Sequence, residues 1–186
     1  KWLTVGRESK PLKIDVPGVD RKGIEKSRVK QGQKGIGRLS CAALGSMMLL
    51  VSKKKLQPFV ACLLDWRISE NPYLMLNVIN IPITEFHSKE ELIDILPDMF
   101  DTLLGNVWGD GKDNIRDSRI EQAWQLFSEL EKNDNKDLTK ELIEQTVINT
   151  CFDNKHFLSW PVWGSDSEHG TAMFIAGILD DLVAQL

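Results

Sequence analysis

MLLVSK (residues 48–53), PFVACLLDW (58–66) and LMLNVINIPI (74–83) are three apolar runs that predict three consecutive β-strands. In the middle run apolar residues occupy odd and even positions alike, so we expect at least one strand to be buried on both faces and central in its sheet. Asn71-Pro72 marks the turn between the second and third strands, and Pro82 ends the third or places it at an edge. This antiparallel meander predicts an α/β fold, a two-layer sandwich with a mixed, largely antiparallel sheet.

Residues 88–157 change to helical periodicity. SKEE (88–91) and SRIE (118–121) both match the capping-box pattern that starts a helix, and each precedes apolar residues three and four positions apart. A third helix is expected from about 137 to 151. Because this block is acidic and longer than the sheet requires, we interpret it as a helical insertion that packs on the sheet or binds a protein partner.

The end of the chain returns to an apolar pattern. TAMFIAGILDDLVAQL (171–186) predicts a buried strand followed by a short helix. The aromatic run HFLSWPVWG (156–164) fits a packed strand or edge, and the alternative is an exposed recognition patch.

Composition places the chain among ordinary globular domains, with 186 residues of which 42% are hydrophobic and 27% charged. No apolar run reaches the length of a membrane span. The net charge of −4 hides an asymmetry. Residues 1–55 hold fourteen Lys/Arg against four Asp/Glu (+10), whereas residues 56–186 hold nine against twenty-three (−14). Basic charge concentrated in the first third predicts a polyanion site there.

Cysteine and histidine usage argues against disulfide and metal chemistry. The three cysteines (Cys41, Cys62 and Cys151) show no Cys-x-x-Cys spacing and fit reduced core residues of a cytoplasmic protein. The three histidines are scattered along the chain, so no histidine metal site is predicted.

GQKGIGRLSCAALG (32–45) is the candidate polyanion site. Its closely spaced glycines let backbone amides turn toward an anion, and a small-residue helix at about 38–46 would point its N-terminus at that anion. The segment lacks the Lys-Ser/Thr of a Walker loop and the third glycine of a dinucleotide fingerprint. The preceding residues 6–34, rich in Pro, Gly and charge, predict a long loop of the kind that forms a lid.

GQKGIGRLSCAALG resembles the glycine-rich lid of the GHKL ATPases, which include gyrase, the ninety-kilodalton heat-shock chaperones and the microrchidia proteins. WLTVGRESK (2–10) is similar to the Thr/Ser-Lys element that follows the adenine pocket in that family. HGTAMFIAG (169–177) is similar to the late strand whose Gly-Thr lies under the adenine. The resemblance is to the heat-shock chaperone and microrchidia type of member and covers roughly residues 1–65 and 165–186.

The resemblance implies a Bergerat-like fold and an ATP-binding function, with the lid closing over the triphosphate. It divides the chain into the lid and central part of an ATP-binding domain (1–87), the helical insertion (88–157) and a closing strand and helix (158–186). It also implies a nucleotide site. That site would consist of Gly32, Gln33, Lys34, Gly35, Ile36, Gly37 and Arg38 around the phosphates, Lys10 at the nucleotide mouth, and Gly170 and Thr171 near the adenine.

Two elements of the family pattern are missing. An upstream helix with Glu and Asn, whose Asn binds magnesium, is absent, and so is the Asp-x-Gly-x-Gly loop that recognises adenine. The one Asp-Gly, Asp110-Gly111, is out of order, and Lys112 also excludes an EF-hand there. We therefore expect the chain to be the C-terminal part of a nucleotide-binding domain. It would bind ATP with a magnesium ligand supplied from outside, and it would not hydrolyse ATP efficiently alone.

Alternatives remain open at this stage. Lys34 and Lys10 are as readily explained as solvated lysines, and Thr171 as an ordinary strand start. The chain as a whole fits a non-catalytic interaction module on a truncated or degenerate ATPase fold, with the acidic helices binding a protein. A weaker alternative is a nucleic-acid-binding module using the basic first third. We also expect that the chain can form a homodimer through the ATPase domain. We expect a cytoplasmic location and no contact with a membrane.

Overall fold

The computed structural model describes residues 17–19, 25–27, 41–150, 169–179 and 183–184. Two compact units divide the chain, residues 1–43 and residues 44–186. In the first, β1 (Pro17–Val19) and β2 (Glu25–Ser27) form a two-stranded antiparallel sheet inside the segment 6–34 that was predicted to be loop throughout.

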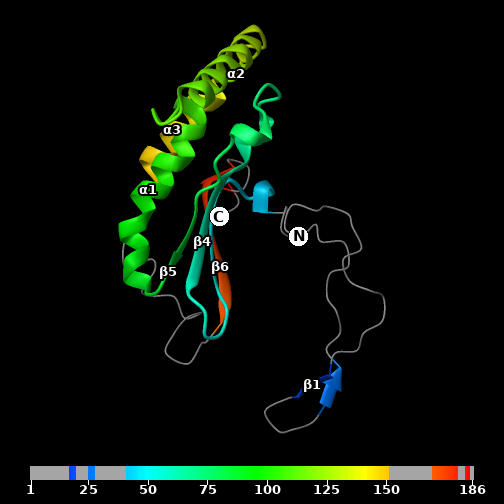
Figure 1. Cartoon of the computed structure of the whole chain (residues 1–186). Helices are drawn as coiled ribbons and strands as arrows, with labels where there is room; N and C mark the ends of the chain where they lie inside the picture. Colours follow the sequence, from blue (N-terminus) through cyan, green and yellow to red (C-terminus); the bar gives the residue numbers. More distant parts are fainter. Residues whose placement is uncertain (1–16, 20–24, 28–40, 151–168, 180–182, 185–186) are drawn as a thin grey trace. The chain divides into compact units, whose positions relative to one another are not determined.

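The second unit is built on a four-stranded antiparallel sheet (Figure 1). Its strands are β3 (Gly45–Lys53), β4 (Phe59–Asp65), β5 (Ile83–Phe86) and β6 (Gly170–Ile178), in the order β5-β4-β3-β6. With three helices packed on the sheet, the predicted two-layer α/β fold is confirmed. The central position predicted for the second apolar run is confirmed as well, because β4 lies between β3 and β5.

The prediction of a third strand over 74–83 is wrong. The strand begins only at Ile83, and Leu76–Val78 instead form a short 3-10 turn, η3. Leu74 just before this turn and Val78 within it are both buried in the core. The backbone of Asn80 is bound by the side chain of Asn106, which takes the place of a neighbouring strand.

The prediction of a small-residue helix at about 38–46 is wrong at its C-terminal end. Residues 41–43 form a 3-10 turn, and β3 already begins at Gly45. Hydrogen-bonded pairing with β6 extends to Gly45, opposite Ile178, and therefore overrides the helical pattern. Residues 38–40 lie outside the described part of the chain.

Three helices follow β5: α1 (Lys89–Trp108), α2 (Asn114–Asn133) and α3 (Thr139–Asn149). The first capping box is confirmed, because Ser88 Oγ accepts a hydrogen bond from the Glu91 backbone N–H. The second capping box, predicted at residues 118–121, is wrong. Asp113 caps α2 by accepting from two backbone N–H groups, so the helix starts before the SRIE motif is reached.

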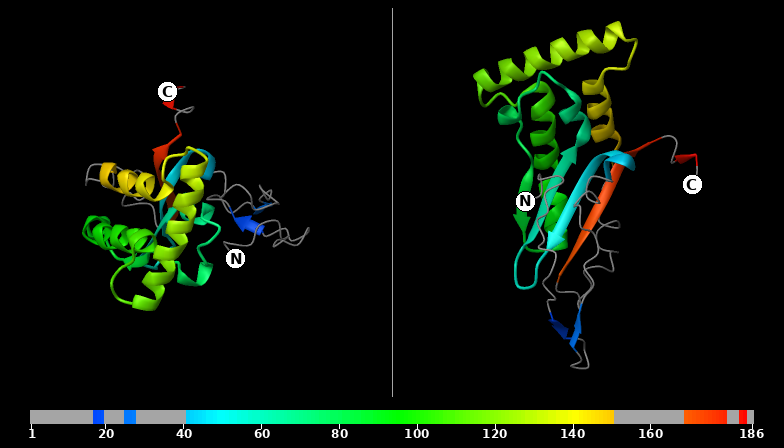
Figure 2. Two further views of the ribbon diagram at one scale, coloured as in Figure 1. Left: turned by 90° about the horizontal axis from the view of Figure 1, so that it is seen from above. Right: turned by 90° about the vertical axis from the view of Figure 1, so that its right-hand side faces the viewer.

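The helices cover one face of the sheet, with α1 and α3 side by side and α2 across one end of the pair (Figure 2). The core therefore lies between this helical layer and the inward residues of the strands. These include Met47, Leu49, Val51, Phe59, Ala61 and Leu63 from the sheet and Leu92, Leu96, Met99, Leu103, Ile120 and Trp124 from the helices.

The opposite face of the sheet is also apolar. Cross-strand pairing places Ile83, Cys62, Leu50 and Met173 in one row and Leu64, Met48 and Ile175 in the next. In this outer face Met48 is fully buried, whereas Met173 is half exposed. The sheet thus has two apolar faces, and the three helices account for one of them.

Gly45 is a position where β3 and β6 approach too closely for a side chain. A Cβ there would lie 2.6 Å from Ile175 Cγ2 and 2.8 Å from the Ala176 carbonyl oxygen. We expect Gly45→Ala to lower the free energy of unfolding by about 1–3 kcal/mol, because backbone atoms must shift. Urea unfolding measures this, and an unchanged midpoint would contradict the close approach of the two strands.

Candidate functional site

Gly170 and Thr171 lie at the start of β6, where they pair with Lys53 and Ser52 at the end of β3. The Thr171 and Ser52 hydroxyl oxygens are 3.0 Å apart, although 119 residues separate them in sequence. Ser52 Oγ also lies within donating distance, 3.4 Å, of the Gly170 carbonyl oxygen. Two hydroxyls therefore meet at one end of the sheet, and the Thr171 side chain is exposed there.

The outer face of the sheet adjoins these hydroxyls. Thr171 and Ser52 share a row with Val60 across the strands, and the next row contains Leu50 and Met173. An exposed hydroxyl beside an apolar surface can hydrogen-bond the edge of a flat ring whose face packs on the apolar side chains. Sequence reasoning missed Leu50 and Met173. Met173 could have been found because it lies two residues after Thr171, and residues two apart on a strand share a face of the sheet. Leu50 could not, because the sequence does not show which strand pairs with β6.

Lys53 adds a cation at the same end of the sheet. It pairs with Gly170 in register, and its Nζ lies 4.3 Å from the centroid of the Phe59 ring. Phe59 in turn stacks on Phe86 with ring centroids 5.0 Å apart. This cation–π contact directs the ammonium toward the helical face, whereas the hydroxyls belong to the outer face. Lys53 was not among the residues predicted for the site.

The glycine segment 32–38 and Lys10 lie outside the described residues. Their predicted roles at the phosphates and at the nucleotide mouth therefore stay predictions. Of the residues predicted for the site, the structure places Gly170 and Thr171, which it brings together as neighbours on one strand.

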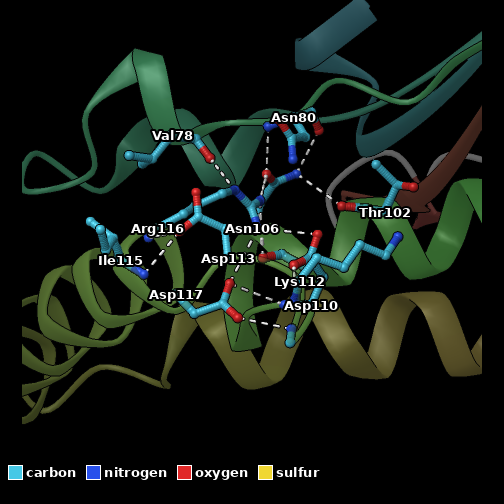
Figure 3. A network of polar contacts seen from close by, with 12 residues as sticks. Val78, Asn80, Thr102, Asn106, Asp110, Lys112, Asp113, Ile115, Arg116 and Asp117 are labelled. Atoms are coloured by element: carbon cyan, nitrogen blue, oxygen red, sulfur yellow. Dashed lines mark hydrogen bonds and ion pairs between the residues drawn. The ribbon is translucent and has the colours of Figure 1, made fainter.

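A dense polar network joins the end of α1 to the start of α2 (Figure 3). Arg116 donates to the Val78 carbonyl at 2.9 Å and to Asn106 Oδ1 at 3.0 Å, and it forms ion pairs of 3.4 Å with Asp110 and Asp117. Only 11% of the Arg116 side chain is exposed. Since the Arg116 guanidinium is directed at protein acceptors on η3, α1 and the start of α2, we interpret this cluster as one that organises the fold.

A buried glutamate fixes α3 against α2. Glu131 accepts a hydrogen bond from the Thr139 backbone N–H at 3.1 Å and another from the Thr139 hydroxyl. The carboxylate thus caps the N-terminus of α3, where no side chain of the preceding residue does so. The start of α3, including Lys140, is held at a defined place beside α2.

The described residues do not favour a cysteine nucleophile or a metal site. Burial raises the pKa of the Cys62 thiol, so it stays protonated at neutral pH and is a poor nucleophile. No group of three or more His, Cys, Asp or Glu side chains is placed to hold a metal among these residues. Within the same residues, no helix combines the length and apolar character that crossing a membrane requires.

Comparison with known proteins identifies no relative. No family model, no curated protein and no solved structure matches the chain.

Proposed function

We propose that this chain is the ATP-binding module of a GHKL-type ATPase, in which the glycine-rich lid closes over the nucleotide triphosphate. The observation that carries this is the pairing of β6 with β3. The strand that starts with Gly170-Thr171 lies directly beside the strand that follows the glycine segment, although the two are far apart in sequence. The strand that starts with Gly170-Thr171 thus shares a sheet with the strand that begins at Gly45, the last residue of the glycine segment, in a two-layer α/β fold.

The environment of Thr171 suits an adenine ring. The Thr171 hydroxyl is exposed at the edge of the apolar outer face, and Leu50 and Met173 lie in the adjacent row. In this proposal the ring packs on these side chains while the hydroxyl bonds a ring nitrogen directly or through water. Backbone amides of residues 32–37 would hold the β- and γ-phosphates, each charge-assisted bond contributing about 1.5–3 kcal/mol. Magnesium would accompany the nucleotide, with its protein ligand outside this chain, and a cytoplasmic location fits such a protein.

Nucleotide-dependent thermal stability tests this function. The protein carrying this chain, with any native residues upstream of it, is melted with and without magnesium and a non-hydrolysable ATP analogue. At a hundredfold excess over Kd, binding should stabilise it by about 2.7 kcal/mol. For a domain of this size that corresponds to a rise in Tm of about 5–10 °C.

Two variants make the test specific. Gly37→Val should abolish the nucleotide-dependent rise without changing the melting of the free protein, because a branched side chain blocks the approach of phosphate to the backbone. Gly111→Asn is the matched control, since its Cβ meets nothing within 4 Å and asparagine tolerates the positive φ of 71°. A wild-type protein that shows no rise would contradict the proposed function and favour the interaction-module alternative.

A further inference from the structure

An open groove of about 720 Å³ runs along α2, between the end of α1 and the start of α3. Its wall on α2 is a stripe of side chains three and four residues apart, extending from Asn114 to Lys132. The eighteen steps from Asn114 to Lys132, at about 1.5 Å per residue, make this wall roughly 27 Å long. That length is suited to an extended stretch of polypeptide rather than to a compact metabolite.

Trp108 forms the aromatic surface of this groove. About half of its side chain is exposed (49%), and the Lys140 Nζ lies 4.9 Å from the ring centroid. The ring therefore already accepts a cation, supplied by the chain itself. An arginine or lysine side chain from another molecule could take the same place once Lys140 swings away.

Ser128 adds a polar group that the fold leaves unused. Its side chain lines the groove and is 5% exposed, yet its hydroxyl has no hydrogen-bond partner. Buried hydroxyls are normally paired, and an unpaired one gains a bond when a ligand brings a complementary group. Ser128 is thus an independent indication that this groove takes a ligand with hydrogen-bonding groups.

The charge around Trp108 selects a cationic ligand. Trp108 lines both this groove and a neighbouring hollow, and acidic residues outnumber basic ones in each. The charged residues of the groove are Asp117, Glu121, Glu129, Lys132 and Lys140, and those of the hollow are Asp98, Asp101, Asp110 and Lys112. The helical segment 88–150 as a whole holds fifteen Asp/Glu against seven Lys/Arg, a net charge of −8. This field attracts a basic peptide and repels the phosphates of nucleic acid.

We propose that this groove binds a basic peptide segment of a partner protein. An arginine or lysine side chain of the peptide replaces the Lys140 ammonium on Trp108, and the Ser128 hydroxyl bonds the peptide backbone. The site is separate from the β3–β6 end of the sheet and does not depend on nucleotide.

Fluorescence anisotropy with a labelled synthetic peptide of alternating glycine and arginine tests this on the whole chain. Lys140→Ala should bind the peptide about three- to tenfold more tightly, because it vacates the ring and removes a positive charge. Lys136→Ala is the matched control. It removes a lysine from the connection between α2 and α3, but that lysine is 68% exposed, pairs with Asp134 and does not line the groove. It should change the affinity by less than about twofold.

Two further variants separate the groove from general charge attraction. Trp108→Ala should weaken binding about tenfold, and Ser128→Ala about threefold to tenfold. Equal affinities of Lys140→Ala and Lys136→Ala, or wild-type affinity in Trp108→Ala, would overturn the site. A glutamate-rich peptide that binds more tightly than the arginine peptide would also overturn it. Because Lys140→Ala leaves the Trp108 ring in place, it tests the site independently of Trp108→Ala.

Discussion

Replacing Arg116 with alanine should lower the free energy of unfolding by about 3 kcal/mol, the largest loss expected from a single polar side chain in this fold. Arg116 bonds the Val78 carbonyl, the Gly105 carbonyl and Asn106 Oδ1, so it connects η3, α1 and α2. Its removal leaves these partly buried acceptors unpaired, together with two carboxylates that lose their counter-ion.

Urea unfolding monitored by circular dichroism measures this effect as a lower midpoint with an unchanged m-value. Arg116→Lys should recover less than half of the loss, because an ammonium cannot reproduce the divergent donors of the guanidinium. Arg119→Ala is the control on the same helix, where the side chain is exposed, and should stay within about 0.5 kcal/mol of wild type. Equal midpoints for the Arg116 and Arg119 variants would show that the network contributes nothing to stability.

Trp124→Ala should lower the free energy of unfolding by about 3–5 kcal/mol. The Trp124 side chain is 2% exposed and lies in the core with Ile120 and Leu103. Its indole N–H also donates to the Asn106 carbonyl at 2.8 Å. Alanine at this position therefore creates a cavity and leaves a buried carbonyl without its donor.

Trp124→Phe separates these two contributions. It keeps most of the buried ring but loses the N–H, so we expect a loss of about 1–3 kcal/mol. The same unfolding assay applies, with the half-exposed Trp108→Ala as the control that should cost less than about 1 kcal/mol. A Trp124→Phe protein as unstable as Trp124→Ala would show that the hydrogen bond, rather than the ring volume, dominates.

Asn106 couples these two predictions. Its side chain accepts from Arg116 and from the Asn80 backbone (Figure 3), and its backbone carbonyl accepts from the Trp124 indole N–H. We therefore expect the double variant of Arg116 and Trp124 to be less unstable than the two single losses added together, since both disturb the same residue.

Elements with a self-contained pattern could be predicted from the sequence. The apolar runs of β3 and β4 and the cap of α1 at Ser88 each lie within a window of about ten residues. β4 and the cap are found where they were expected, and β3 includes its predicted run but begins three residues earlier, at Gly45. The α2 start was displaced because two competing caps, Asp113 and Ser118, lie close together, and local pattern alone does not rank them.

Some residues of the candidate site could likewise be predicted from the sequence, and others could not. Gly170 and Thr171 could be selected from sequence because the resemblance is carried by adjacent residues. Their neighbours Ser52, Leu50 and Lys53 could not, since strand pairing across more than one hundred residues decides which side chains share a face. The groove along α2 is equally non-local, because Trp108, Ser128 and Lys140 come from three different helices.

The amino-acid sequence by itself determined the two-layer α/β class, the two apolar strands, the helical segment and the separation of basic from acidic charge, because these follow from periodicity and composition within short windows. Tertiary structure alone decided the strand order β5-β4-β3-β6, the loss of the strand expected over 74–83, and the meeting of Thr171 with Ser52. The physical reason is that these features depend on contacts between distant residues. The Asn106 side chain, for example, satisfies the Asn80 backbone in place of a neighbouring strand.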